Sequence, residues 1–171
     1  MDLPPYGRPG GFGRQGSPLY RVGPGRAMSY SLDVNLLLYA SDQSSPRNGD
    51  ALRFLESRTN DPDLFCLAWP TLISYLRIAT HPRIFRHPLS PDEALANVAS
   101  LLSLPRVRVL AEAEGFLEVY REVTGNFPVR GNLVPDAHLA ALMRQHGVRR
   151  IYTTDADFKK FDFLKVKNPF T

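Results

Sequence analysis

The fold expected for this chain follows from one short segment, Ser31-Leu32-Asp33-Val34-Asn35-Leu36-Leu37-Leu38-Tyr39-Ala40. Tyr30–Asp33 predicts a short apolar strand that ends in an acid, and the apolar run Val34–Ala40 predicts a helix directly after it. The same change from strand to helix recurs along the chain. Strands that alternate with helices indicate a mostly parallel central sheet covered by helices on both faces, which is a three-layer α/β/α architecture.

The other elements are predicted from hydrophobic spacing and from residues that begin or end helices. Further strands are expected at Leu64–Ala68, Val107–Leu110, Arg150–Thr153 and Leu164–Val166. Further helices are expected at Pro46–Ser57, Trp69–Thr80, Pro91–Ser103, Glu112–Thr124 and Pro135–His146, with a short turn at Asp157–Phe161. In the helix Pro46–Ser57, Leu52 and Leu55 are expected to form the inner face.

The clearest helix start is Ser90-Pro91-Asp92-Glu93. Ser90 can cap the helix, Pro91 suits its first position, and Glu93 completes a capping box.

Length and composition point to one domain and exclude several classes of protein. The chain has 171 residues, and 28–171 is long enough for a single domain with a substantial core. The lone Cys66 excludes an internal disulfide and a cysteine-based zinc framework. No apolar run is long enough to span a membrane, and the first residues lack the apolar stretch of a secretory signal. We therefore expect a soluble, cytoplasmic protein.

Residues 1–27 differ in composition from the rest of the chain. They contain seven glycines and five prolines, and four arginines stand against one aspartate. The remainder holds 17 basic and 16 acidic residues, so most of the net charge of +4 comes from this segment. The composition predicts a disordered arm. The arm either contacts RNA through its arginines or is a tail without a role. A third interpretation is that the true start is Met28, which directly precedes the first structured pattern.

Four acids occupy special positions in the expected sheet: Asp33, Asp136, Asp155 and Asp157. Asp33 follows the first strand, Asp155 and Asp157 follow Arg150–Thr153, and Asp136 lies in the first turn of a helix. Strand carboxyl ends and helix amino ends share one edge of such a sheet, where ligands bind. Each acid could simply cap a helix. Gathered together, they would repel each other unless protonated or bridged by a cation, and an all-oxygen cluster suits Mg²⁺ or Mn²⁺.

These segments resemble the PIN-domain family, specifically the VapC-type toxins of bacterial toxin–antitoxin pairs. Residues 31–40 resemble the opening motif of the family. Its third acidic motif is similar to Gly131-Asn132-Leu133-Val134-Pro135-Asp136-Ala137-His138, and its closing motif to Thr153-Thr154-Asp155-Ala156-Asp157-Phe158. A further match to one VapC subgroup is Trp69-Pro70-Thr71-Leu72-Ile73-Ser74-Tyr75-Leu76-Arg77-Ile78-Ala79-Thr80.

The resemblance implies a PIN-like fold with four to five strands and a Mg²⁺- or Mn²⁺-dependent endoribonuclease site. Asp33 and Asp136 match the principal metal ligands, and Asp155, Asp157 or both match the last acid. The resemblance assigns catalysis to Asp33, Asp136 and Asp155. It further implies a cognate VapB-type antitoxin, an RNA substrate and a homodimer.

The chain departs from the family in one motif. Most members carry a Glu on the helix after the second strand, whereas Trp69–Thr80 contains no acid and has Ser74 or Tyr75 at about that position. Glu93 or Asp42 could substitute for it. Two alternatives therefore stay open: a catalytically weakened PIN domain that acts by binding RNA or its antitoxin, and an RNA-processing nuclease outside any toxin pair.

Several polar residues allow two interpretations each. Asn35 and Asn132 either hydrogen-bond the ligating carboxylates or serve turns and caps, and Thr153 either orients Asp155 or only ends a strand. His138 either faces a phosphate or is a partly buried structural histidine. Arg77 begins a basic run that is either a solvated face or a site for RNA phosphates, and the run continues with His81, Arg83, Arg86 and His87.

Overall fold

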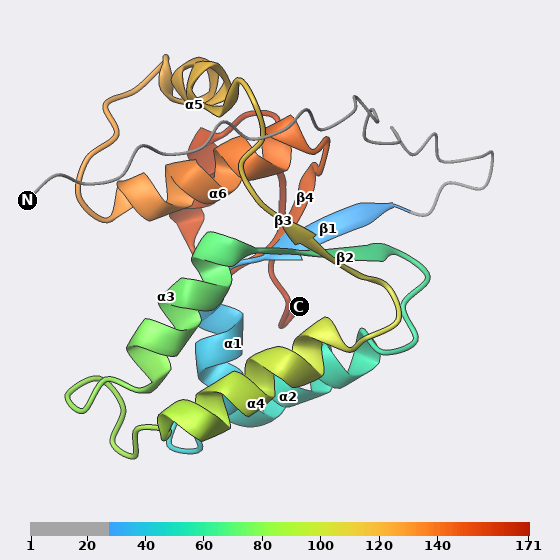
Figure 1. Ribbon diagram of the computed structural model, residues 1–171, viewed down its shortest axis with the longest axis vertical. Helices are drawn as coiled ribbons and strands as arrows, with labels where there is room; N and C mark the ends of the chain where they lie inside the picture. The colour runs from blue at the N-terminus through green and yellow to red at the C-terminus, as the bar shows by residue number, and fades with distance from the viewer. Residues whose placement is uncertain (1–27) are drawn as a thin grey trace, which may run out of the picture.

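The computed structural model describes residues 28–171, and a five-stranded parallel sheet lies at its centre (Figure 1). The strand order is β3-β2-β1-β4-β5, and every neighbouring pair is parallel. The strands are β1 (Ser29–Leu32), β2 (Leu64–Ala68), β3 (Val107–Leu110), β4 (Arg150–Tyr152) and β5 (Lys165–Lys167). The predicted α/β class with a mostly parallel sheet is confirmed.

Six α-helices and one 3₁₀ helix connect the strands in the described part of the chain. They are α1 (Val34–Ser41), α2 (Asn48–Ser57), α3 (Trp69–Ala79), α4 (Pro91–Leu102), α5 (Phe116–Thr124), α6 (Leu133–Gln145) and the 3₁₀ helix η1 (Ala156–Lys160). Helices α1 to α4 lie on one side of the sheet, and α5 and α6 lie on the other (Figure 1).

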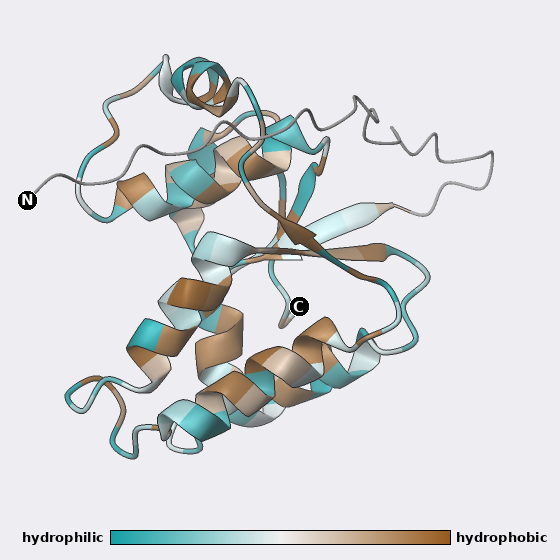
Figure 2. Cartoon of the chain, viewed as in Figure 1, coloured by the Kyte–Doolittle hydropathy of each residue, from teal (hydrophilic) through white to brown (hydrophobic). Residues whose placement is uncertain are grey.

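The core is divided by the sheet into two layers. Strand β2 sends Phe65 and Leu67 into the layer beneath α1 to α4, and sends Cys66 and Ala68 into the layer beneath α5 and α6. Alternate residues of a strand face opposite sides, so a strand covered on both faces must be apolar throughout. This explains the continuous apolar run of β2, which is brown in Figure 2.

Helix α4 begins as the sequence predicts. The Ser90 hydroxyl accepts a bond from the Glu93 N–H at 3.2 Å, and the Ser90 N–H donates to the Glu93 carboxylate at 2.8 Å. The capping box is therefore confirmed.

Three helix starts and part of one inner face differ from the prediction. Helix α2 begins at Asn48 instead of Pro46. Helix α5 begins at Phe116 instead of Glu112, because Gly115 adopts φ +78°, a left-handed conformation that no α-helix contains. Helix α6 begins at Leu133, before Pro135, because the first turn of a helix tolerates a residue without an N–H. Leu55 packs against the core as predicted, whereas Leu52 is 42% exposed, and the fully buried residue of α2 is Ala51.

No helix within residues 28–171 is long and apolar enough to cross a membrane. The expected disordered arm at 1–27 lies outside the described residues and stays a prediction.

The register of β1 against β4 positions the functional edge of the sheet. Leu32 is paired with Tyr152, so the next residues, Asp33 and Thr153, leave the sheet side by side. The Asp33 N–H donates to the Tyr152 carbonyl at 3.1 Å and continues the pairing to this point. The first predicted acid is thereby placed beside the segment that carries Asp155 and Asp157.

Candidate metal centre

Asp33 is a buried carboxylate at the carboxyl end of β1. Its side chain is held in place through Oδ2, which accepts hydrogen bonds from Asn35 Nδ2 at 2.8 Å and Thr153 Oγ1 at 3.0 Å. Asp33 precedes α1 and forms no side-chain capping bond of good geometry, although the backbone N–H groups of Val34 and Asn35 at the start of α1 help to lower its pKa. Burial raises the pKa of Asp33, an effect that the Thr153 hydrogen bond opposes. The two side-chain bonds, from Asn35 and Thr153, therefore fix the orientation of this buried carboxylate.

Thr153 connects Asp33 to the loop after β4. The residue is buried, and its hydroxyl donates its single proton to Asp33 while it accepts a bond from the Asp155 N–H at 2.8 Å. Thr153 therefore orients Asp33 and also the loop that carries Asp155. This favours the positioning role over a strand end alone.

Asp155 and Asp157 occupy the start of η1. Asp155 caps η1, since its Oδ1 accepts a bond from the Asp157 N–H at 2.8 Å. Asp157 forms an exposed ion pair with Lys160, with Nζ to Oδ1 at 2.7 Å. The capping interpretation thus holds for Asp155, although its carboxylate also faces its acidic neighbours.

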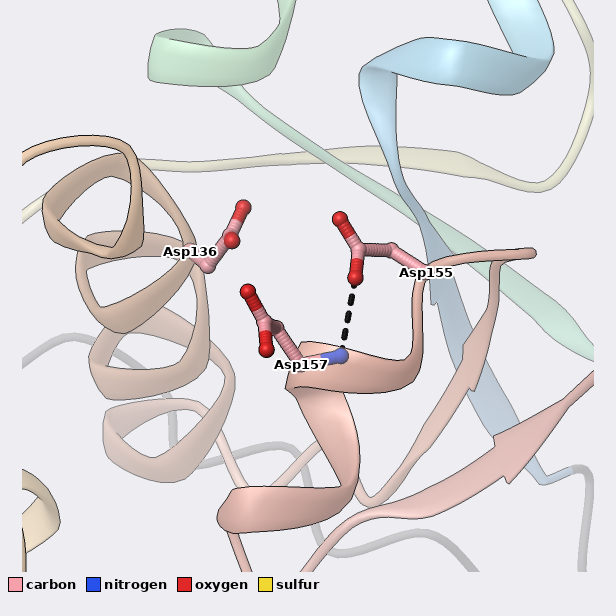
Figure 3. A group of neighbouring side chains, drawn as sticks. All are labelled: Asp136, Asp155 and Asp157. Carbon is pink, nitrogen blue, oxygen red and sulfur yellow. Dashed lines mark hydrogen bonds between the residues drawn. The ribbon is translucent and has the colours of Figure 1, made fainter.

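Asp136 completes a group of three carboxylates. It lies in the first turn of α6 and points toward Asp155 and Asp157, and one carboxylate oxygen from each residue lies within 4.8 Å of the others (Figure 3). Within residues 28–171 the Asp136 side chain accepts no hydrogen bond and forms no ion pair. Burial raises its pKa to about 7, and the carboxylates of Asp33, Asp155 and Asp157 add to this shift.

Asp33 lies outside this group of three but shares a pocket with Asp136. The pocket has a volume of about 40 Å³, which is room for about one water molecule or a small ion. Its lining residues are Asp33, Val34, Pro70, Thr71, Ser74, Pro135, Asp136 and Leu139. Asp33 and Asp136 therefore meet across one small opening between α3 and α6.

Of the two residues near the expected position of the family's Glu, Ser74 and not Tyr75 faces the acids. Ser74 lines the pocket. Tyr75 is instead buried in the core layer beneath α1 to α4, where its hydroxyl is hydrogen-bonded to Ser41 Oγ at 2.7 Å and accepts a bond from Asn97 Nδ2 at 2.9 Å. The proposed substitutes lie elsewhere. Glu93 is engaged in the capping box of α4, and Asp42 accepts bonds from Ser44.

Four predicted residues remain, and each has a different environment: Asn35, Asn132, Arg77 and His138. Asn35 bonds Asp33, whereas Asn132 is exposed and its side chain makes no capping bond at the start of α6. Arg77 is exposed on α3, one turn beyond Ser74. His138 pairs with Glu112 at 2.5 Å and packs beside Phe116, which fits the structural interpretation.

Thr71 was not singled out by the sequence patterns. It is buried and lines the pocket from the first turn of α3. A threonine three residues after the end of the apolar strand β2 is the only signal for it, and that signal is weak because Thr is common near helix starts.

The donor set fits a divalent cation. Several carboxylates that face one another repel, and a cation between them removes that repulsion. The unpartnered carboxylate of Asp136, whose pKa is raised by its acidic neighbours, is the clearest sign of such a place. Asp136, Asp155 and Asp157, with Asp33 beside them, are the carboxylates that could hold such an ion.

Comparison with known proteins agrees with the fold and the motifs. The PIN-domain model matches residues 30–164. The chain is 43% identical over 144 residues to Ribonuclease VapC48 of Mycobacterium tuberculosis, covering 84% of this chain and 99% of that protein. It is 30% identical over 138 residues to Ribonuclease VapC37 of the same organism, covering 81% and 95%.

Solved structures share the fold at lower identity. VapC20 of Mycobacterium tuberculosis, described as a sarcin-ricin loop cleaving toxin, has a TM-score of 0.57 at 22% identity and covers 76% of this chain and 92% of its own. VapBC2 of Rickettsia felis, bound to a promoter DNA fragment, has a TM-score of 0.60 at 16% identity and covers 82% and 98%. The chain therefore belongs to the PIN-domain family, and within it to the VapC-type proteins.

Proposed function

We propose that this chain is a Mg²⁺- or Mn²⁺-dependent endoribonuclease, the toxin of a VapBC-type toxin–antitoxin pair. The observation that carries the proposal is the gathering of Asp136, Asp155 and Asp157 beside the Asp33 pocket. Relatives at 43% and 30% identity are named ribonucleases, which supports the same activity here.

The chemistry of the donors favours Mg²⁺ or Mn²⁺ over zinc. Within residues 28–171 the group of acids contains no cysteine or histidine, and hard oxygen ligands suit Mg²⁺ and Mn²⁺. We assign Asp33, Asp136, Asp155 and Asp157 as the residues that hold the ion. When bound, the ion activates a water and neutralises charge on the phosphate and the leaving oxygen.

The chain's own residues position these carboxylates. Thr153 and Asn35 both donate to Asp33 Oδ2 and fix the orientation of that carboxylate. Thr153 also accepts the Asp155 N–H, so one hydroxyl sets the spacing between Asp33 and the η1 loop. Positioning of this kind lowers the reorganisation that reaction would otherwise require.

Ser74 supports a second candidate function, a PIN domain that binds RNA or its antitoxin with weak or no cleavage. A neutral hydroxyl at this place supplies no charge, so the ion lacks the glutamate ligand that the family resemblance leads us to expect. Mg²⁺ readily keeps several water ligands, so the smaller donor set is compatible with activity. Cleavage measured directly separates the two functions.

A VapB-type antitoxin is the proposed partner. The solved structures that share the fold include VapBC complexes from Rickettsia felis and Haemophilus influenzae. Growth arrest on expression, relieved by a small protein encoded immediately upstream, is expected for a toxin. A ribonuclease whose expression leaves growth unchanged and which lacks such a neighbour would be an RNA-processing enzyme instead.

The central experiment is cleavage of total RNA by the purified chain with Mg²⁺, Mn²⁺ or EDTA. Cleavage is expected only with metal and is expected to be lost in Asp136→Asn. Asp162→Asn is the matched control, because Asp162 is an exposed acid near η1 that forms no ion pair within residues 28–171. Cleavage in EDTA, or equal cleavage by Asp136→Asn, would contradict the proposal.

A further inference from the structure

A basic surface without acids lies on α3 and the loop that follows it. Between Asp63 and Asp92 the sequence contains no Asp or Glu, yet it contains Arg77, Arg83 and Arg86. All three arginines are exposed. The positive charge of this stretch is therefore not balanced by acids of its own segment.

These three arginines take no part in holding the fold together. Within residues 28–171 their side chains form no ion pair and donate no hydrogen bond. Other arginines do: Arg58 pairs with Asp61, and Arg150 pairs with Asp63 at 2.9 Å. The guanidinium groups of the basic surface remain available to a ligand.

The basic surface begins at the acidic pocket. Pro70 and Ser74 line the pocket from α3, and Arg77 follows on the same helical face, since residues four and three apart are neighbours. Arg77 lies about 4.5 Å farther along the helix axis than Ser74, at a rise of about 1.5 Å per residue. Helix α3 then leads away from the sheet to the loop 80–90 (Figure 1).

The loop holds Arg83 and Arg86 in defined places. Phe85 lies between them and is buried in the core layer beneath α1 to α4. The Leu89 N–H donates to the Ala79 carbonyl at 2.9 Å and closes the base of the loop. An anchored loop of this kind presents its two arginines without the entropy cost of ordering a free segment.

We propose that Arg77, Arg83 and Arg86 bind backbone phosphates of the RNA strand on one side of the bond that is cleaved. The inference rests on the proposed ribonuclease function and assigns a surface for its substrate. The acidic centre repels a polyanion until a cation is bound, so affinity for RNA has to come from outside it. Arginine suits phosphate because its planar group donates two parallel hydrogen bonds.

The test measures RNA binding in a protein that cannot cleave. In an Asp136→Asn background with EDTA, a fluorescein-labelled single-stranded RNA of mixed sequence is titrated at several KCl concentrations and followed by anisotropy. The variant Arg77→Ala/Arg83→Ala/Arg86→Ala is compared with Arg121→Ala/Arg149→Ala/Lys165→Ala. The control set removes three exposed cations outside α3 and its loop. Two of them, Arg149 and Lys165, lie at the amino ends of β4 and β5, at the edge of the sheet opposite to the acids.

The test variant is expected to lose affinity about tenfold or more at low salt. Its slope of log affinity against log salt should fall by about 2, since each phosphate contact on a single strand contributes about 0.7. The control should keep the parent affinity and slope. Circular dichroism and thermal midpoints check that both variants are folded.

Each other result overturns the inference or separates it from the proposed function. Equal losses in both variants, or no loss in either, overturn it. Unchanged RNA binding with an altered sedimentation coefficient would make the surface a protein contact and would also overturn it. If wild type cleaves RNA but the test variant binds normally, only the surface is wrong. If wild type never cleaves but binding requires the three arginines, the surface stands and the ribonuclease function fails.

Discussion

The hydroxyl of Thr153 donates a hydrogen bond to Asp33 Oδ2 at 3.0 Å, although the two residues are 120 positions apart in the chain. The same hydroxyl accepts the Asp155 N–H. One short polar side chain thus joins the carboxyl end of β1 to the loop after β4, and the geometry of the acidic centre depends on it.

Replacing this hydroxyl by a methyl group should cost stability. Thr153→Val keeps the shape of the side chain but leaves a buried carboxylate and an N–H short of one partner each, which costs about 1–3 kcal/mol of unfolding free energy. Urea denaturation measures this loss, and calorimetric titration should show weaker Mn²⁺ binding. Thr153→Ser should restore both properties. A Thr153→Val protein with wild-type stability and Mn²⁺ affinity would show that the bond is dispensable.

Divalent metal should stabilise the folded chain. An ion that binds the gathered acids, but not the dispersed acids of the unfolded chain, stabilises by about 2.7 kcal/mol at a hundred times its dissociation constant. The rise in Tm on adding Mn²⁺ should shrink sharply in Asp33→Asn. Asp162→Asn should behave as wild type. An equal rise in wild type and Asp33→Asn would remove Asp33 from the metal site.

Without metal, stability should depend on pH through Asp136. Its pKa is raised from 3.8 to about 7 by burial and by neighbouring carboxylates, so the folded chain keeps a proton that the unfolded chain releases. The resulting stability is present below about pH 4 and is lost as the pH rises toward about 7. In EDTA, Asp136→Asn should therefore flatten this part of the stability profile and be more stable than wild type above neutral pH. A parallel decline in wild type and Asp136→Asn would contradict the assignment.

Adding an acid at Ser74 should strengthen metal binding. Ser74 lines the pocket that Asp33 and Asp136 share, so Ser74→Glu places another carboxylate beside them. Without metal the variant should have a lower Tm because of added repulsion, and with Mn²⁺ it should bind more tightly than wild type, as calorimetry would show. Ser74→Gln, of nearly the same size, should lack the gain. If Ser74→Glu bound Mn²⁺ no better than Ser74→Gln, an acid at this place would not act as a ligand.

Much of the fold could be read from local patterns. Tyr30–Asp33 followed by Val34–Ala40 predicts a strand and a helix, because hydrophobic periodicity and burial act over a few residues. The capping box at Ser90 is local as well and was predicted correctly. The helix start predicted at Glu112 is wrong, because Gly115 adopts a left-handed conformation and α5 begins only at Phe116.

The candidate site was predicted only in part. The sequence places Asp33, Asp136 and Asp155 at one edge of a parallel sheet, because strand and helix order determine that edge. It does not distinguish Asn35, which bonds Asp33, from Asn132, which is exposed.

By itself the sequence determined the order of strands and helices, the family motifs and the edge at which the acids would lie. Only the tertiary structure decided which of two adjacent residues, Ser74 or Tyr75, enters the pocket. Neighbours on a helix point about 100° apart, and the packing of α3 against the sheet and α6 sets which one faces the acids. The bond between Thr153 and Asp33 likewise depends on the register of β4 against β1, a pairing between distant segments that no local pattern encodes.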